Sequence, residues 1–336
     1  MNEPTTHSDP DTLAADESDE MTPEAAVGDP AQEDAPTVDE EADTETDQSG
    51  TAGDDQDEMP ATIISRIPGA AAKKAPEHDP MIRVAQRTHF GAVRDRNEDS
   101  YLVFQTDSGG HFKLMPFGLY IVADGMGGHA NGHVASKLAS RVAARHIIRE
   151  IYFPLLQDAH GANQKPVQEV LVDAVTAANK AVFEVDPEAD SGTTLTVALL
   201  LGRRLHVAHV GDSRIYLFKE GKLKVISSDH SLAQRLQDVG HLTSEEATFF
   251  PYRHVLLRAV GQSEEVEVDF YMQPLPESGK LLLCSDGLCG MLPDSLLQTV
   301  LAEEMPVEET VDVLIEAALM AGGYDNITAI VVEFDL

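Results

Sequence analysis

The sequence has few cysteines, no long apolar run and, in its first 60 residues, no lysine or arginine. Its two cysteines, Cys284 and Cys289, are too few for a disulfide framework, so we predict small buried core residues rather than a redox pair. No apolar run approaches the ~18 residues that a membrane span requires. The acidic N-terminus lacks the charged and then apolar pattern of a secretory signal. Together these absences predict a cytoplasmic protein that has no membrane partner.

Acidic residues greatly outnumber basic ones, and the excess is uneven along the chain. The 336 residues include 58 Asp and Glu against 24 Lys and Arg, which gives a formal net charge of −34. Residues 1–80 contain about 23 acidic and 3 basic residues, so this stretch alone carries roughly −20. Because a field of this sign repels nucleic acid and anionic lipid, we expect no nucleic-acid partner.

The composition divides the chain at residue 81 into an acidic tail and a folded domain. Residues 1–80 have a single apolar cluster, at Ile63, Ile64 and Ile67. Such a segment buries too little surface to offset its chain entropy, and we predict that residues 1–80 are disordered. Residues 81–336 alternate apolar runs with amphipathic stretches and are long enough to build one substantial core.

Within residues 81–336, short apolar runs predict strands and a 3.6-residue spacing predicts helices. Buried strands are expected at residues 119–123, 194–201, 205–210, 281–285 and 327–334. Two further runs, residues 214–218 and 222–226, flank Lys219-Glu220-Gly221 and indicate a hairpin. Helices are expected at residues 134–147, at 167–182 with Pro166 suited to the first turn, and at 307–320. Strands joined by hairpins indicate antiparallel sheets, and paired helices indicate layers on those sheets.

Acidic residues recur at the ends of these apolar runs: Asp124, Asp212 and Asp286 follow one, Asp325 precedes one, and Glu98-Asp99 lies just before Tyr101. Strand ends bring distant residues to one edge of a sheet, where gathered carboxylates repel one another unless cations neutralise them. Oxygen ligands without a Cys or His pattern suit Mg²⁺ or Mn²⁺. Each aspartate is also explained as a turn or cap residue, and the spacing alone leaves both interpretations open.

The sequence lacks the markers of several other catalytic classes. The stretch Asp124-Gly-Met-Gly-Gly128 has no Walker lysine and is a weak match to a phosphate-binding loop. The 13 histidines show neither H-E-x-x-H nor a paired zinc spacing, so His206, His209 and His230 are expected to be structural. There is no G-x-S-x-G motif, the marker of a serine hydrolase.

Six motifs follow one another between Arg87 and Phe334. They are Gly91-Ala-Val-Arg94 with Asn97-Glu-Asp-Ser100, Val122-Ala-Asp-Gly-Met-Gly-Gly128, Ser191-Gly-Thr-Thr194, His209-Val-Gly-Asp-Ser-Arg214, Cys284-Ser-Asp-Gly287 and Asp325-Asn-Ile-Thr328. In this order they resemble the metal-dependent protein serine/threonine phosphatases of type 2C, in their compact bacterial form. The resemblance implies an α+β fold, a four-layer α-β-β-α sandwich with two central antiparallel sheets and helix pairs on both outer faces.

The resemblance also implies a ligand set for two Mn²⁺ or Mg²⁺ ions in residues 81–336. Asp124 matches the carboxylate that bridges both ions, and Gly125 matches the position whose backbone carbonyl binds one of them. Asp286 and Asp325 match ligands of the first ion, and Glu98 matches a ligand of the second ion that acts through water.

A third, weaker metal site is implied at Asp212, and it also uses Asp286. Arg94 matches the clamp for the substrate phosphate, a role that suits the guanidinium fork. By analogy with the family, a metal-bridged hydroxide attacks phosphorus in line, and no phosphoenzyme is needed. Met126 stands where some eukaryotic members carry a histidine, and since Met cannot donate a proton, a metal-bound water or His129 is expected to protonate the leaving group.

The implied activity is hydrolysis of phosphoserine and phosphothreonine in phosphorylated proteins, by a monomer that opposes a serine/threonine kinase. Two alternatives are a phosphatase of a partner-switching anti-sigma pathway and a pseudophosphatase that acts as a binding module; intact Arg94 and Asp124 argue against the second. Residues 229–261 resemble the family's flap, whose variable sequence is where substrate choice is expected to lie. In the tail, a phosphorylated threonine in Thr44-Glu-Thr-Asp47 would suit a phosphothreonine-binding domain.

Overall fold

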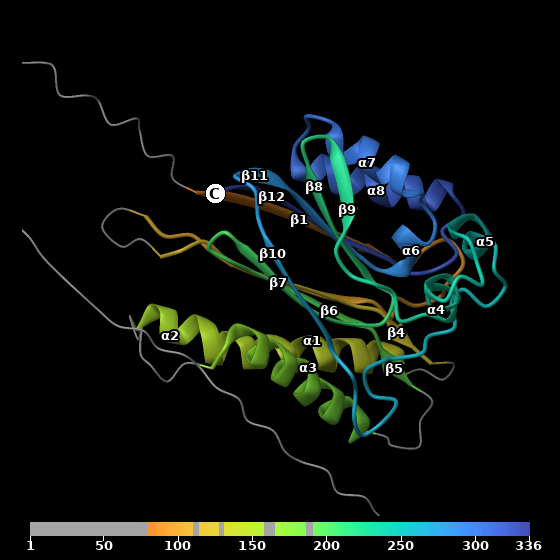
Figure 1. Ribbon diagram of the computed structural model, residues 1–336, viewed down its shortest axis with the longest axis horizontal. Helices are drawn as coiled ribbons and strands as arrows, with labels where there is room; N and C mark the ends of the chain where they lie inside the picture. Colours follow the sequence, from red (N-terminus) through yellow and green to blue (C-terminus); the bar gives the residue numbers. More distant parts are fainter. Residues whose placement is uncertain (1–79, 110–113, 128–130, 158–164, 186–190) are drawn as a thin grey trace, which may run out of the picture. The chain divides into compact units, whose positions relative to one another are not determined.

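The computed structural model describes residues 80–109, 114–127, 131–157, 165–185 and 191–336 (Figure 1). All of them belong to one compact unit, which spans Lys73–Leu336. The predicted disorder of residues 1–80 concerns a segment that, apart from Pro80, lies outside the described residues, so it stays a prediction. Gly128 and His129 also lie outside them.

Two five-stranded antiparallel sheets form the centre of this unit. The first sheet has the order β1 (Met81–His89), β12 (Ile327–Asp335), β11 (Ser278–Cys284), β8 (Arg214–Lys219) and β9 (Lys222–Val225). The second has the order β10 (Asp269–Pro274), β7 (Arg204–Val210), β6 (Leu195–Leu201), β3 (Phe117–Ala123) and β2 (Ser100–Thr106). A short pair joins β4 (Gly125–Met126) to β5 (Gly192–Thr193).

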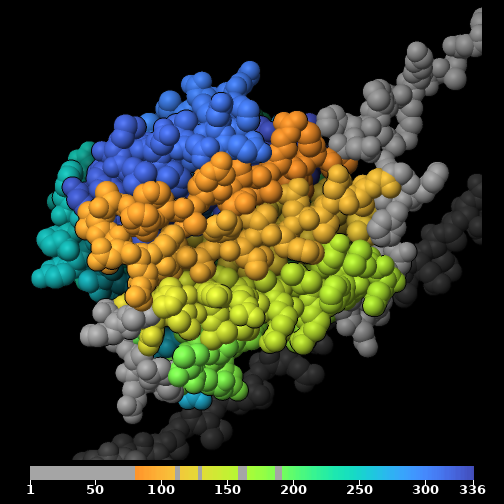
Figure 2. All heavy atoms as spheres, turned by 180° about the vertical axis from the view of Figure 1, so that it is seen from behind, coloured from red at the N-terminus to blue at the C-terminus, as the bar shows by residue number. Residues whose placement is uncertain are grey.

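Helices cover the outer face of each sheet, so the layers run helix, sheet, sheet, helix (Figure 1). The second sheet is covered by α1 (Gly132–Ile147) and α3 (Val167–Phe183), and the first by α7 (Asp294–Ala302) and α8 (Val307–Met320). After α1 the chain continues through a π-helical turn, η2 (Ile148–Tyr152), and α2 (Phe153–Leu156). Three short helices lie in connections: α4 (Leu232–Asp238) and α5 (Ser244–Thr248) between β9 and β10, and α6 (Asp286–Cys289) directly after β11. Figure 2 shows the first strands, in orange, between the two helical layers.

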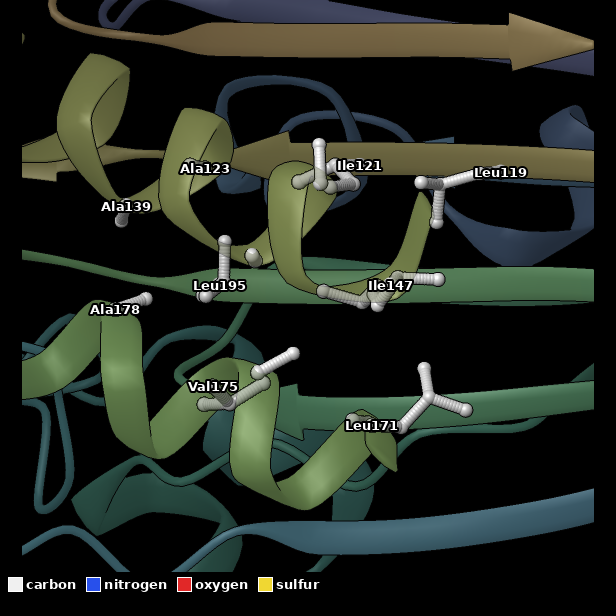
Figure 3. Close-up of a cluster of buried hydrophobic side chains, with 14 of the residues drawn as sticks. Leu119, Ile121, Ala123, Ala139, Ile147, Leu171, Val175, Ala178 and Leu195 are labelled. Atoms are coloured by element: carbon white, nitrogen blue, oxygen red, sulfur yellow. The ribbon is translucent and has the colours of Figure 1, made fainter. Parts of the chain in front are cut away.

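The side-chain alternation of the strands explains why the layers stay together. On β3, Leu119 and Ile121 join the apolar cluster beneath α1 and α3, whereas Tyr120 and Val122 join the cluster between the sheets. Figure 3 shows the first of these clusters, where Leu119 and Ile121 lie with side chains from both helices. Because β3 is buried along its whole length, it reads as a continuous apolar run in the sequence.

The predicted four-layer α+β sandwich is confirmed, together with the predicted strands and helices. Helix α8 has the predicted bounds, and α3 begins at Val167, with Pro166 at the N-cap rather than inside the first turn. In the β8–β9 hairpin, Glu220 and Gly221 have φ values of 50° and 73°, as a two-residue type I′ turn requires. Both cysteines are free and buried, as predicted. Of the helices in the described ranges, none is both long and apolar enough to cross a membrane.

Candidate metal and phosphate site

Strand pairing brings the sequence-predicted carboxylates to one end of the two sheets. Ser100 pairs with Ala123, so the residues before β2 lie beside Asp124, which follows β3. Cys284 pairs with Ala329, so Asp286 lies just beyond β11, near Asp325, which precedes β12. The segment between β7 and β8 adds Asp212.

These residues line one cleft of about 570 Å³. All seven predicted site residues are among its walls: Arg94, Glu98, Asp124, Gly125, Asp212, Asp286 and Asp325. Residues 229–261, the flap-like segment, contribute Arg253, His254 and Leu256. The structure therefore gathers the predicted set in one place.

The floor of the cleft, here meaning Asp124, Asp212 and Asp286, brings together carboxyl groups that repel one another. Burial raises the pKa of Asp124 well above its usual range, and the neighbouring Asp99, Asp286 and Asp212 raise it further. Burial, followed by repulsion from Asp286, likewise raises the pKa of Asp212. A bound cation would offset both causes, because it would supply the positive charge that these carboxylates lack.

Unpaired buried oxygens indicate what this floor is suited to bind. Oδ1 of Asp286 and Oδ1 of Asp99 are buried, and neither has a hydrogen-bond partner. Native proteins rarely leave buried polar atoms unpaired, and a hard cation is a fitting partner for carboxylate oxygens. In its chemistry, a set of carboxylate oxygens, the cleft therefore suits Mg²⁺ or Mn²⁺.

The carboxylates line the cleft without closing on one point. Across the described ranges, no group of three or more His, Cys, Asp or Glu side chains is arranged so that it could hold a metal ion. Instead, Arg94 Nη2 donates to Asp325 Oδ2 at 2.7 Å, and the two side chains are 55% and 35% exposed. The predicted phosphate clamp thus pairs with a predicted metal ligand across the mouth of the cleft. This ion pair between distant loops had no signal in the sequence.

Asp99 is a partly buried acid that the predicted ligand set does not include, although the sequence motif contains it. Its Oδ2 accepts hydrogen bonds from Ser285 Oγ at 2.8 Å and from Thr328 Oγ1 at 2.7 Å. Burial raises its pKa, and the two hydroxyl donors oppose that rise. Asp99 therefore lies behind the cleft, where it fixes the segments that carry Asp286 and Asp325.

Asn326 holds the loop that carries Arg94 and Glu98 in place. Its Oδ1 accepts from the backbone N–H of Glu98 at 2.7 Å. Its Nδ2 donates to the carbonyl oxygens of Phe90 at 3.1 Å and Arg96 at 2.8 Å. The Asp-Asn pair of the sixth motif thus supplies one residue to the cleft and one to the loop opposite.

Two glycines permit close backbone approach at the cleft. A Cβ on Gly125 would collide with the carbonyl of Gly132, and one on Gly287 would collide with the carbonyl of Asn326. Any side chain at these positions would push the chain segments of the cleft apart. This requirement explains why glycine follows both Asp124 and Asp286.

The side chain of Thr194 holds the backbone of Asp124 in place. Thr194 Oγ1 accepts from the Asp124 N–H at 2.9 Å and lies 2.8 Å from Ser213 Oγ, next to Asp212. The third sequence motif thus connects two acidic residues of the cleft. From the flap-like segment, His254 Nδ1 approaches Asp286 Oδ2 at 3.4 Å. Neither His254 nor Arg253 was singled out by the sequence, because both lie in the flap-like segment and outside the six motifs.

Comparison with known proteins gives consistent matches. A family model described as protein phosphatase 2C matches residues 92–319, more than half of the chain. The serine/threonine phosphatase stp of Listeria monocytogenes is 37% identical over 263 residues, covering 74% of this chain and 95% of that protein. The serine/threonine protein phosphatase PstP of Mycobacterium tuberculosis is 37% identical over 261 residues, covering 75% of this chain and 45% of that protein.

Solved structures agree with the sequence matches. The crystal structure of M. tuberculosis PstP/Ppp aligns with a TM-score of 0.61 and 37% identity, covering 75% of this chain and 98% of that chain. The catalytic domain of PstP in complex with two manganese ions aligns with a TM-score of 0.61 and 35% identity, covering 76% and 99%.

Proposed function

Because the chain belongs to the protein phosphatase 2C family, we propose that its cleft is the active site at which phosphoserine and phosphothreonine in proteins are hydrolysed. The chain is a protein serine/threonine phosphatase of the 2C type, as the Listeria and mycobacterial relatives are serine/threonine phosphatases by name. The solved catalytic domain of PstP carries two manganese ions, which supports metal dependence here. The observation that carries the assignment of the site is the gathering of strand-end carboxylates and one arginine in a single cleft.

We propose that Asp124, the Gly125 carbonyl, Asp286, Asp325 and Glu98 hold two Mn²⁺ or Mg²⁺ ions, and that Asp212 with Asp286 holds a third. The raised pKa values of Asp124 and Asp212 and the unpaired oxygen of Asp286 support this set. When bound, such ions activate water as a nucleophile at neutral pH and offset negative charge on the phosphoryl group.

The protein's own residues position the phosphate. Arg94 lies at the mouth of the cleft with a half-exposed guanidinium, and its fork is suited to two oxygens of a phosphate dianion. In the proposed complex Arg94 exchanges the Asp325 carboxylate for the substrate phosphate, which leaves Asp325 available to a cation. The geometry requires no nucleophilic side chain.

The physiological substrates and partners are proposed by class. We propose that the enzyme acts in the cytoplasm as a monomer and reverses the work of a serine/threonine kinase. A partner-switching anti-sigma pathway would use the same cleft on a different substrate. A phosphothreonine-binding domain remains the partner that we propose for the tail.

Turnover of p-nitrophenyl phosphate and of a phosphothreonine peptide by the full chain tests the proposal. We expect both to be hydrolysed with Mn²⁺ or Mg²⁺ and neither to be hydrolysed in excess chelator. Full turnover in chelator after exhaustive dialysis would exclude the metal-dependent mechanism, and no turnover with either metal would favour the pseudophosphatase.

A further inference from the structure

We infer that an exposed apolar rim of the cleft binds an apolar side chain of the polypeptide substrate, close to its phosphorylated residue. This rim, here called the apolar lip, consists of Phe90, Val93, Met320 and Tyr324. The inference rests on the proposed function, since it concerns the substrate of the same cleft.

All four side chains of the apolar lip are large and well exposed. Met320 is 83% exposed, Tyr324 64%, Val93 60% and Phe90 51%. Single exposed apolar residues are common on protein surfaces and need no explanation, whereas a gathering of them commonly marks an interaction site. The decisive question is whether these four residues gather.

Two loops that are distant in sequence bring the four residues together. The backbone N–H of Ala92 donates to the carbonyl of Gly323 at 2.7 Å, and Asn326 Nδ2 donates to the carbonyl of Phe90 at 3.1 Å. A Cβ on Gly91 would collide with the carbonyl of Asp325, so glycine is needed for this contact. The first loop therefore lies directly on the second, which places the four residues of the apolar lip on adjoining segments of the surface.

The apolar lip is continuous with the proposed phosphate site. Val93 precedes Arg94 and Tyr324 precedes Asp325, and these two successors form the 2.7 Å ion pair at the cleft mouth. Tyr324 itself lines the cleft. An extended peptide advances about 3.3–3.6 Å per residue, so a side chain within about three positions of the phosphorylated residue would reach the lip.

The chemistry of the apolar lip selects an apolar occupant. None of its four side chains is charged, so the lip itself offers no ionic partner to a substrate side chain. Burying one Leu-sized side chain there would contribute about 1.5–3 kcal/mol. The flap-like segment, in contrast, presents Arg253 and His254 to the cleft. We therefore commit to a substrate with Leu, Ile, Met or Phe near its phosphothreonine.

A peptide series tests this inference on the full chain. The substrates are phosphothreonine peptides that differ only in carrying Leu or Asp at single positions within three residues of the phosphothreonine, with p-nitrophenyl phosphate as a substrate that has no flanking residues. We expect Leu to raise kcat/KM about tenfold over Asp at one or two positions, mainly through KM. Equal kcat/KM for Leu and Asp at every position would overturn the inference.

Variants then locate the effect. The double variant Phe90→Ser/Met320→Ser should lose the preference for Leu, whereas Met272→Ser, which alters a methionine 57% exposed on β10, should keep it. Turnover of p-nitrophenyl phosphate should stay within about twofold in the unmodified chain, the double variant and Met272→Ser, since none of the substituted residues lines the cleft. A preference that survives in the double variant, or in Val93→Ser as a second test, would contradict the inference.

Two outcomes separate this inference from its alternatives. If the unmodified chain fails to hydrolyse p-nitrophenyl phosphate with Mn²⁺, the proposed function fails, and the apolar lip loses its role with it. If light scattering at assay concentration shows a dimer that the double variant abolishes, the lip is a contact between two copies, and its assignment to substrate is wrong.

Discussion

The acids of the cleft floor and the side chain of His209 are both buried polar groups, but only the hydrogen bonds of His209 are completed by the protein. His209 Nδ1 lies 2.9 Å from Thr196 Oγ1, and its Nε2 lies 3.1 Å from the carbonyl of Ser228. Because that carbonyl can only accept, Nε2 carries a hydrogen. On the cleft floor, Oδ1 of Asp286 is buried without a partner.

The difference separates a structural polar group from a binding one. At His209, burial lowers the pKa to about 3, so the ring stays neutral and its two hydrogen bonds are internal. At Asp124, burial and neighbouring acids raise the pKa. A bound cation would supply the positive charge that offsets the repulsion among these carboxylates. A buried polar group with complete hydrogen bonds specifies the fold, whereas an unpaired carboxylate oxygen among other acids in an open cleft is suited to bind a cation.

The largest effect is expected from removing a carboxylate of the cleft floor. Asp124→Asn keeps the size of the side chain but removes the charge that the proposed cations require, so kcat should fall by about 10³-fold or more. Steady-state kinetics on p-nitrophenyl phosphate with Mn²⁺ measures this loss. A kcat within tenfold of the unmodified enzyme would remove Asp124 from the proposed centre.

A smaller effect, of a different kind, is expected at the mouth of the cleft. Arg94→Ala removes the guanidinium fork and should raise KM by about tenfold or more, about 1.4 kcal/mol of lost binding, with a smaller change in kcat. Arg94→Lys keeps the charge without the fork and serves as the matched control. Profiles identical to that of Asp124→Asn would show that clamp and ligand were assigned wrongly.

A substitution of His209, whose hydrogen bonds are complete, should change the stability of the fold and leave turnover largely unchanged. His209→Ala leaves the Ser228 carbonyl and the Thr196 hydroxyl without their partner, which should lower the free energy of unfolding by about 1–3 kcal/mol. Urea unfolding followed by circular dichroism measures this change. His209→Gln, which retains an amide donor, should restore part of it, and the absence of any loss in the Ala variant would mean that the network adds nothing.

The two regions should also respond to pH with opposite signs. The pKa of His209 is lower in the folded chain than the usual 6.5, so its contribution to stability is present above about pH 6.5 and is lost as the pH falls toward 3. The pKa of Asp124 is higher in the folded chain, so its contribution is present at low pH and is lost as the pH rises.

Melting temperatures between about pH 4 and pH 8 test this pair of signs, with slopes of at most about 1.4 kcal/mol per pH unit for each group. His209→Gln should flatten the decline on the acid side. Asp124→Asn should flatten the decline on the alkaline side, as should saturating Mn²⁺ in the unmodified chain. A steeper alkaline decline in Asp124→Asn would be incompatible with a raised pKa at that residue.

Much of the architecture could be predicted from the sequence, because buried strands such as β3 are continuous apolar runs and α8 has a clear 3.6-residue period. The strands β1 and β10 were not predicted, since they lie at sheet edges and only part of each is buried. Helix α7 was not predicted either, because it buries only Leu297, Val300 and Leu301. Partial burial weakens the periodicity on which sequence reasoning depends.

The site was predictable as a set of residues but not as a geometry. Strand-end aspartates indicated that acids would gather, and family motifs added Arg94 and Glu98. The partly buried position of Asp99 and the pairing of Arg94 with Asp325 depend on contacts between residues more than 180 positions apart. Such contacts follow from strand order and register, which no local pattern specifies.

Direct titration of Mn²⁺ into the full chain is the measurement that bears most closely on the central claim, that the cleft floor needs cations which the chain does not supply. Calorimetry should show saturable binding to the unmodified protein and to His209→Gln, and binding at least about tenfold weaker to Asp124→Asn. Because this readout does not depend on turnover, it separates metal binding from catalysis. Indistinguishable isotherms for the unmodified chain and Asp124→Asn would contradict the account.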